Sequence, residues 1–84
     1  MKTHNLKVWK QYFLPLLHEE KTFELRKNDR DYQVGDILIL IEIDGGEPTG
    51  RYCKREITYI LENAQNFGLI DGFVILGLKV LPPN

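Results

Sequence analysis

Three charged side chains, Lys21, Glu24 and Arg26, lie close together in the sequence and combine two kinds of hydrogen-bond donor with one acceptor. Arginine presents a planar fork that fits a phosphate or the edge of a base, and lysine presents a movable point charge. Glutamate can accept a hydrogen bond from an exocyclic amine. Such a trio could bind a phosphate or the edge of a base. The alternative is a solvated network of ion pairs on the surface of a strand.

A short strand is expected to position these side chains. From Lys21 onward the apolar residues follow a period of two, which places Phe23 and Leu25 on one face and Glu24 and Arg26 on the other. We expect the charged face to be wet and the apolar face to hold the strand against the core. Lys21 then lies at the entrance of the strand.

Further basic residues extend the candidate site. Lys27 and Arg30 follow the predicted strand, and Arg51 follows the glycine-rich segment 44–50, together with Lys54 and Arg55. Such a group could follow a phosphate backbone, or it could be a set of solvated charges on an edge strand. The candidate ligand-binding residues are therefore Lys21, Glu24, Arg26, Lys27, Arg30 and Arg51.

Aromatic residues and the missing motifs narrow the chemistry. Trp9, Tyr12 and Phe13 could stack on bases, but their helical spacing favours packing in the core. The sequence has no phosphate-binding loop and no metal-binding motif, so we expect neither a cofactor nor a metal. His4 and His18 are isolated and are expected to be surface or packing residues. The chain contains no serine, which excludes serine-dependent nucleophilic catalysis.

The remaining elements predict a small α+β fold. A helix is expected over residues 8–18, kinked or divided at Pro15. Strands are expected over residues 37–43, 51–61 and 73–81, with Pro82 and Pro83 ending the last one. The turn residues of segment 44–50 predict a flexible hairpin loop between the first two of these strands. So many short strands with one helix favour a curled sheet or barrel. The residues expected in its core are Ile39, Ile41, Phe73 and Ile75.

Length and composition set the outer limits. The 84 residues allow a single domain over 1–84, and 43% hydrophobic with 27% charged residues is ordinary globular composition. The net charge of −1 implies no bulk attraction to nucleic acid, so any such site must be a local patch. The longest apolar run, residues 37–41, is too short for a membrane span, and a cytoplasmic protein is expected. Cys53 has no partner for a disulfide.

Most of the chain resembles the ASCH (activating signal cointegrator homology) domain. The resemblance is carried by Lys21-Thr22-Phe23-Glu24-Leu25-Arg26, Asn28-Asp29-Arg30, Gly35-Asp36 and the strand after them. The start, Thr3-His4-x-Leu6-Lys7, and the segments 59–61 and 72–76 are similar to short prokaryotic and phage relatives. The resemblance implies a PUA-like β-barrel whose cleft is lined by Lys21, Glu24 and Arg26 and which binds RNA.

Three functions from different classes follow. The first is a module that binds RNA or a modified nucleoside. The second is a small amidohydrolase, because some ASCH relatives hydrolyse N4-acetylcytidine with a lysine and a threonine three residues later. Here Lys21 matches the lysine, but Glu24 occupies the position of the threonine, so that activity is not transferred. The third is a protein-interaction domain, which requires a sizeable exposed apolar patch.

Overall fold

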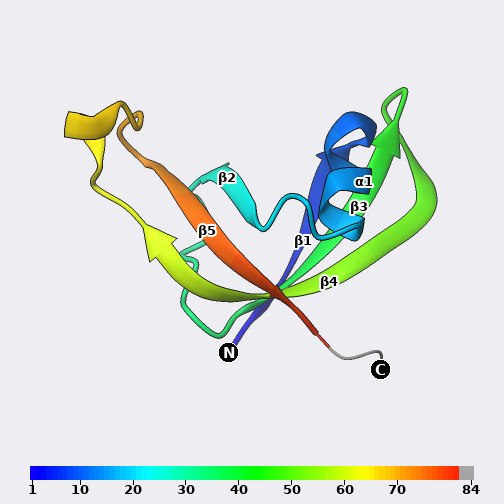
Figure 1. Ribbon diagram of the computed structural model, residues 1–84, viewed down its shortest axis with the longest axis horizontal. Coiled ribbons are helices and arrows are strands. Elements are labelled where there is room, and N and C mark those ends of the chain that lie inside the picture. The colour runs from blue at the N-terminus through cyan, green and yellow to red at the C-terminus, as the bar shows by residue number, and fades with distance from the viewer. Residues whose placement is uncertain (82–84) are drawn as a thin grey trace.

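The computed structural model describes residues 1–81 (Figure 1). In chain order, its elements are β1 (Thr3–Trp9), α1 (Lys10–Leu17), β2 (Phe23–Lys27), β3 (Ile37–Asp44), β4 (Glu47–Leu61), the 3-10 helix η1 (Gln65–Phe67) and β5 (Phe73–Val80). The predicted end of the last strand at Pro82 and Pro83 lies outside the described residues.

All five strands belong to one sheet in the order β1-β3-β4-β5-β2. The β1–β3 pair is parallel, and the other pairs are antiparallel. The long strand β4 pairs with β3 over residues 47–56 and with β5 over residues 55–61. Figure 1 shows β4 bending between these two parts, so that the sheet curls into a half-barrel with β1 and β2 at its edges. The predicted small α+β fold with a curled sheet is confirmed.

Alternate residues of the inner strands form the core. Leu38 and Leu40 of β3 and Val74 and Leu76 of β5 expose 2% of their surface or less. The predicted core residues have the opposite parity: Ile39, Ile41, Phe73 and Ile75 are only half-buried. The prediction was wrong because both strands are apolar on both faces, and such a pattern does not indicate which face is inside.

The first strand was missed by the sequence pattern. The helix expected over residues 8–18 begins only at Lys10, and Thr3–Trp9 forms β1, in which His4, Leu6 and Val8 point inward. The alternation was hidden because one of the three inward side chains is a histidine. The helix α1 continues through Pro15 and packs Phe13 and Leu16, both fully buried, on the sheet.

A tight turn joins β3 to β4. The flexible loop expected over residues 44–50 shrinks to Gly45 and Gly46, because β3 ends at Asp44 and β4 begins at Glu47. Both glycines have positive φ, +60° and +83°, as the two central residues of a type I′ hairpin turn require. The turn sets the register next to it, where Asp44 pairs with Glu47 and Ile43 with Pro48. A bulge between Ile41 and Ile43 shifts the register of the rest of the hairpin.

Asp36 connects the start of the chain to the loop before β3. Its carboxylate lies 2.9 Å from Nε2 of His4 and accepts the backbone N–H groups of Lys2 and Gln33, each at 3.0 Å. The ring of Tyr32 meets the edge of the His4 ring at a centroid distance of 4.9 Å. Burial alone would raise the pKa of Asp36, but the hydrogen bonds from Lys2, His4 and Gln33 outweigh it and lower the pKa from 3.8 to about 2. His4 is thus a packing residue, as expected.

The parity of β3 can be tested with two adjacent substitutions. We expect Leu40→Ala to lower the free energy of unfolding by about 2–5 kcal/mol, because it empties a fully buried site. Ile39→Ala should cost less, since Ile39 is only half-buried. Urea denaturation measures both. An equal or larger loss in Ile39→Ala would contradict this assignment of the core.

The Asp36 contacts predict a pH dependence of stability. Because the pKa of Asp36 is lower in the folded protein, its contribution is complete above pH 3.8 and is lost as the pH falls towards 2. Wild type should lose stability in this window more steeply than Asp36→Asn, which no longer titrates at this position. Urea denaturation between pH 5 and pH 2 gives both curves, and parallel curves would show that Asp36 contributes nothing.

Candidate functional site

Glu24 lies at the centre of the predicted site and is almost completely buried, with 4% of its surface exposed. Its Oε1 accepts a hydrogen bond from Nζ of Lys21 at 2.7 Å, and its Oε2 accepts one from Nε of Arg26 at 2.8 Å. The side chains of Lys21 and Arg26 expose 19% and 25% of their surface. The structure therefore brings the three residues together, as a partly buried ion-pair network rather than a solvated one.

The orientation of β2 is the reverse of the expected one. Glu24 points inward, whereas Phe23 and Leu25 expose 46% and 53% of their surface. Alternation in the sequence separates the two faces of a strand but does not say which of them is buried. Burial of Glu24 is possible because two cations hydrogen-bond its carboxylate. The expectation that Phe23 and Leu25 hold the strand against the core was wrong.

Two arginines connect the edges of the half-barrel. Nη2 of Arg26 donates to the carbonyl oxygen of Lys7 at 2.6 Å, and Nη1 of Arg30 donates to the carbonyl oxygen of Asn5 at 2.9 Å. Both carbonyls belong to β1, and Arg26 belongs to β2, which lies at the opposite edge of the sheet. Side chains thus connect the two edge strands where a closed barrel would have backbone pairing.

A cleft of about 630 Å³ borders this connection, since both Lys7 and Arg26 line it. Aromatic rings and cations line it together. The rings are those of Trp9, Tyr12, Phe23 and Phe73, and the cations are Lys7, Lys21, Arg26 and Lys27. Among the described residues, Glu24 is the one carboxylate in the lining. The cleft is therefore locally positive, although the whole chain carries a net charge of −1.

The aromatic side chains of the cleft are arranged around Lys21. Trp9 and Tyr12 stack with a centroid distance of 6.3 Å and an angle of 18° between their planes. Nζ of Lys21 lies 4.9 Å from the centre of the Phe23 ring and 5.6 Å from that of Tyr12. At these distances the ammonium group is attracted to the faces of both rings. Contacts to Glu24, Tyr12 and Phe23 thus hold Lys21 in place.

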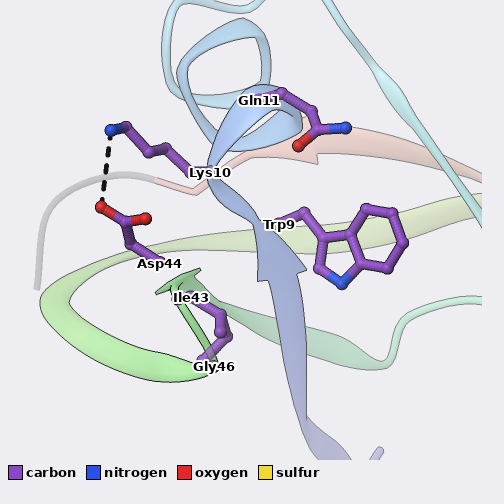
Figure 2. Close-up of a pocket in the computed structure, with 7 residues that line it drawn as sticks. Trp9, Lys10, Gln11, Ile43, Asp44 and Gly46 are labelled. Carbon is purple, nitrogen blue, oxygen red and sulfur yellow. Dashed lines mark ion pairs between the residues drawn. The ribbon is translucent and has the colours of Figure 1, made fainter.

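Trp9 also lines a second, smaller pocket of about 430 Å³. It is lined by the turn after β3 and by Lys10, whose Nζ lies 3.4 Å from Oδ2 of Asp44. Figure 2 shows the Trp9 ring pointing away from this ion pair. The pocket therefore lacks the charged and aromatic cluster that lines the larger cleft.

Similarity to known proteins identifies the family. A family model described as "Domain of unknown function (DUF3850)" matches residues 3–78. The chain belongs to the DUF3850 family. The uncharacterized 12.9 kDa protein in the GpA 3′ region of Escherichia phage P2 is 41% identical over 61 residues, which cover 73% of this chain. The chain spans 56% of the length of that relative.

A solved structure shares the fold of this DUF3850 domain. The crystal structure of hypothetical protein PH0355 superposes with a TM-score of 0.62 over 96% of this chain and 100% of that one. The sequence identity is 16%, so this similarity concerns the fold alone.

Arg51 lies outside the cleft of the DUF3850 domain. Its guanidinium group donates two hydrogen bonds of 2.8 Å, from Nε and Nη2, to the buried carboxylate of Glu42, and it lies 5.4 Å from the centre of the Phe13 ring. The hydrogen bonds from Arg51, with one from Thr49, lower the pKa of Glu42 below its usual value. Arg51 thus has a structural partner, the carboxylate of Glu42 on β3.

The other candidate residues divide between the cleft and its surroundings. Lys27 lines the cleft, whereas Arg30 is engaged with β1 outside it. Trp9 and Tyr12, expected in the core, expose 64% and 46% of their surface, and only Phe13 is buried. The helical spacing of these three residues was misleading because Trp9 ends a strand. The sequence did not identify Lys7 and Phe73 as cleft residues, because their strands approach β2 only in the folded chain.

Neither metal chemistry nor a membrane-spanning helix has support in residues 1–81. This part of the chain contains no cluster of three or more His, Cys, Asp or Glu side chains that could hold a metal ion. Over the same residues, no helix has both the length and the apolar character that crossing a membrane requires.

The contacts of Arg26 predict that it contributes to folding. We expect Arg26→Ala to lower the free energy of unfolding by about 1–3 kcal/mol, because it removes the connection to β1 and leaves a buried carboxylate with one partner fewer. Lys27→Ala, at the exposed end of the same strand, is the control and should stay within about 0.5 kcal/mol of wild type. Equal stability of both variants in urea denaturation would contradict a structural role of Arg26.

Proposed function

We propose that this DUF3850 domain binds RNA or a modified nucleoside in the cleft above Glu24. The observation that carries the proposal is the combination of four aromatic rings and four cations in one cleft. Aromatic side chains stack on bases, and Lys and Arg neutralise phosphates, so this combination is typical of sites for unpaired nucleotides. The resemblance of Lys21-x-x-Glu24-x-Arg26 to the ASCH motif supports the same assignment.

The exposed stacked pair supplies a surface for a base. Trp9 and Tyr12 stack on each other, and both expose a large part of their aromatic rings to solvent. Phe23, on the edge strand, adds a third exposed ring beside Lys21. A base that stacks on these rings would cover apolar surface that folding leaves in water, and this favours binding.

Glu24 gives the cleft a means of recognising the edge of a base. Each carboxylate oxygen accepts one hydrogen bond from the protein, and an ionised carboxylate can accept about four in total. The remaining capacity suits an exocyclic amine, as on cytosine or adenine. Because Lys21 and Arg26 hold the carboxylate in one orientation, it is already in place before a ligand binds.

The hydrolase alternative receives less support from the cleft. Among residues 1–81, no serine, threonine or cysteine lines it, and both oxygens of Glu24 are engaged with cations. Within the described chain, the lining therefore offers no nucleophile of the kind that the threonine supplies in the ASCH relatives. Release of acetate from N4-acetylcytidine, lost in Lys21→Ala, would nevertheless establish the hydrolase.

The protein-interaction alternative involves a different part of the surface. Phe67 and Ile70, between β4 and β5, expose 93% and 70% of their surface and do not line the cleft. Substitutions at the two places therefore separate RNA binding from any contact made by the β4–β5 connection.

A stacking interaction can be tested with the single tryptophan as the probe. Trp9 lines the cleft, so titration of short single-stranded RNAs and cytidine derivatives should change its fluorescence. We expect Tyr12→Ala to weaken binding about 5- to 150-fold, because one stacked ring contributes about 1–3 kcal/mol per base.

The matched control is Phe67→Ala, which removes an exposed aromatic ring that does not line the cleft. It should bind like wild type, and urea denaturation should show both variants folded. Absence of binding by wild type, or the same affinity in Tyr12→Ala as in wild type, would overturn the proposed function.

A further inference from the structure

Arg55 is a buried cation without an acidic partner among the described residues. It lies on β4 and exposes 7% of its surface. Its Nη2 donates to the carbonyl oxygen of Leu16 and its Nη1 to that of Lys54, each at 2.7 Å. Among residues 1–81, no Asp or Glu side chain forms an ion pair with it. This is unusual, because buried charges are normally paired.

The helix α1 accounts for part of this arrangement. Leu16 lies in the last turn of α1, where the helix dipole is negative, and its carbonyl oxygen also accepts the backbone N–H of Glu19 at 3.2 Å. Arg55 therefore stabilises the end of the helix. Two carbonyl contacts, however, use only two of the five N–H donors of a guanidinium group. Within residues 1–81, they leave its full charge without a counter-ion.

Arg55 is one of the residues that line a small hollow of about 260 Å³. Lys21 and Lys79 line it together with Arg55, and Thr22 adds a hydroxyl group. Lys21 is bound to Glu24, and Nζ of Lys79 lies 3.7 Å from Oε2 of Glu56, so these two charges are partly compensated. Glu19 also lines the hollow, but it is exposed and its carboxylate can remain in water.

We propose that this hollow binds a phosphate group. The guanidinium fork of Arg55 fits two phosphate oxygens, while the ammonium groups of Lys21 and Lys79 supply mobile charges. The phosphate would give Arg55 the counter-ion that the described residues do not provide. A site of this kind accepts either free phosphate or the phosphate of a nucleotide.

Lys21 decides between these two sources. It lines both the hollow and the aromatic cleft, so the two sites share one side chain. We therefore assign the phosphate to a nucleotide whose base lies in the cleft, and this assignment depends on the proposed function. The carboxylate of Glu24, hydrogen-bonded to Lys21, would then couple the two sites.

The test is an NMR titration of the ¹⁵N-labelled full chain at low salt with three probes: inorganic phosphate, cytidine and cytidine 5′-monophosphate. Phosphate should shift the amide signals of Thr22 and Lys79 and the Nε–H signal of Arg55. Cytidine should shift the Trp9 indole signal. The monophosphate should shift both groups and bind about tenfold more tightly than cytidine.

Variants identify the hollow as the origin of this gain. Lys79→Gln should reduce the affinity for the monophosphate about fivefold and leave cytidine binding unchanged. Lys54→Gln is the matched control. It also removes one positive charge, at the residue before Arg55 on β4, and Lys54 does not line the hollow. Arg55→Lys keeps the positive charge at this position but loses the guanidinium fork. Arg55 also holds α1. If Arg55→Lys does not fold for this reason, Lys79→Gln carries the test.

The outcomes separate the two proposals. Absence of phosphate-induced shifts around the hollow, or the same loss in Lys79→Gln and Lys54→Gln, would overturn the phosphate site, while shifts of Trp9 by cytidine would still support the proposed function. Phosphate binding in the hollow without any response of Trp9 to cytidine would support the phosphate site and overturn its assignment to a nucleotide.

Discussion

The arrangement of this protein depends on the burial of one carboxylate. Glu24 could not lie almost fully out of water alone, because an unpaired buried charge is strongly destabilising. Lys21 and Arg26 supply the compensating charges, and each of them also contacts another part of the molecule. Arg26 reaches the backbone of β1, and Lys21 reaches the rings of Tyr12 and Phe23. The ion pairs thus connect the edge strand β2 to β1, to α1 and to the cleft.

The orientation of β2 follows from the same carboxylate and explains the chemistry of the surface. Once Glu24 points inward, the strand period turns Phe23 and Leu25 outward, where no other strand of the described chain covers them. Phe23 then becomes part of the cleft lining instead of the core. The half-barrel also brings Trp9, at the end of β1, to the same place. The exposed aromatic cluster is therefore a consequence of the way in which the sheet edges are connected.

The sequence was informative where residue type alone decides the structure. The glycines at 45 and 46, the β-branched run of β3 and the Lys21-Glu24-Arg26 spacing predicted the turn, an inner strand and a charged cluster, and each of these is present. The parity of β3 and β5 could not be predicted, because leucine, isoleucine and valine alternate there without a polar face. The burial of Glu24 could not be predicted either, since it depends on cations that only the folded chain brings within hydrogen-bond distance.

The candidate residues therefore differ in whether a substitution affects folding as well as ligand binding. Arg26 and Arg51 each hold a buried carboxylate, so a substitution at either position affects the fold. Tyr12 and Lys27 expose much of their surface and have few structural contacts, which leaves them available to a ligand. Arg55 lies between these cases, since it is buried like the first pair but lacks a carboxylate among the described residues. A ligand that supplied the missing negative charge would stabilise the fold as it bound, because an anion that binds only the folded state raises its stability.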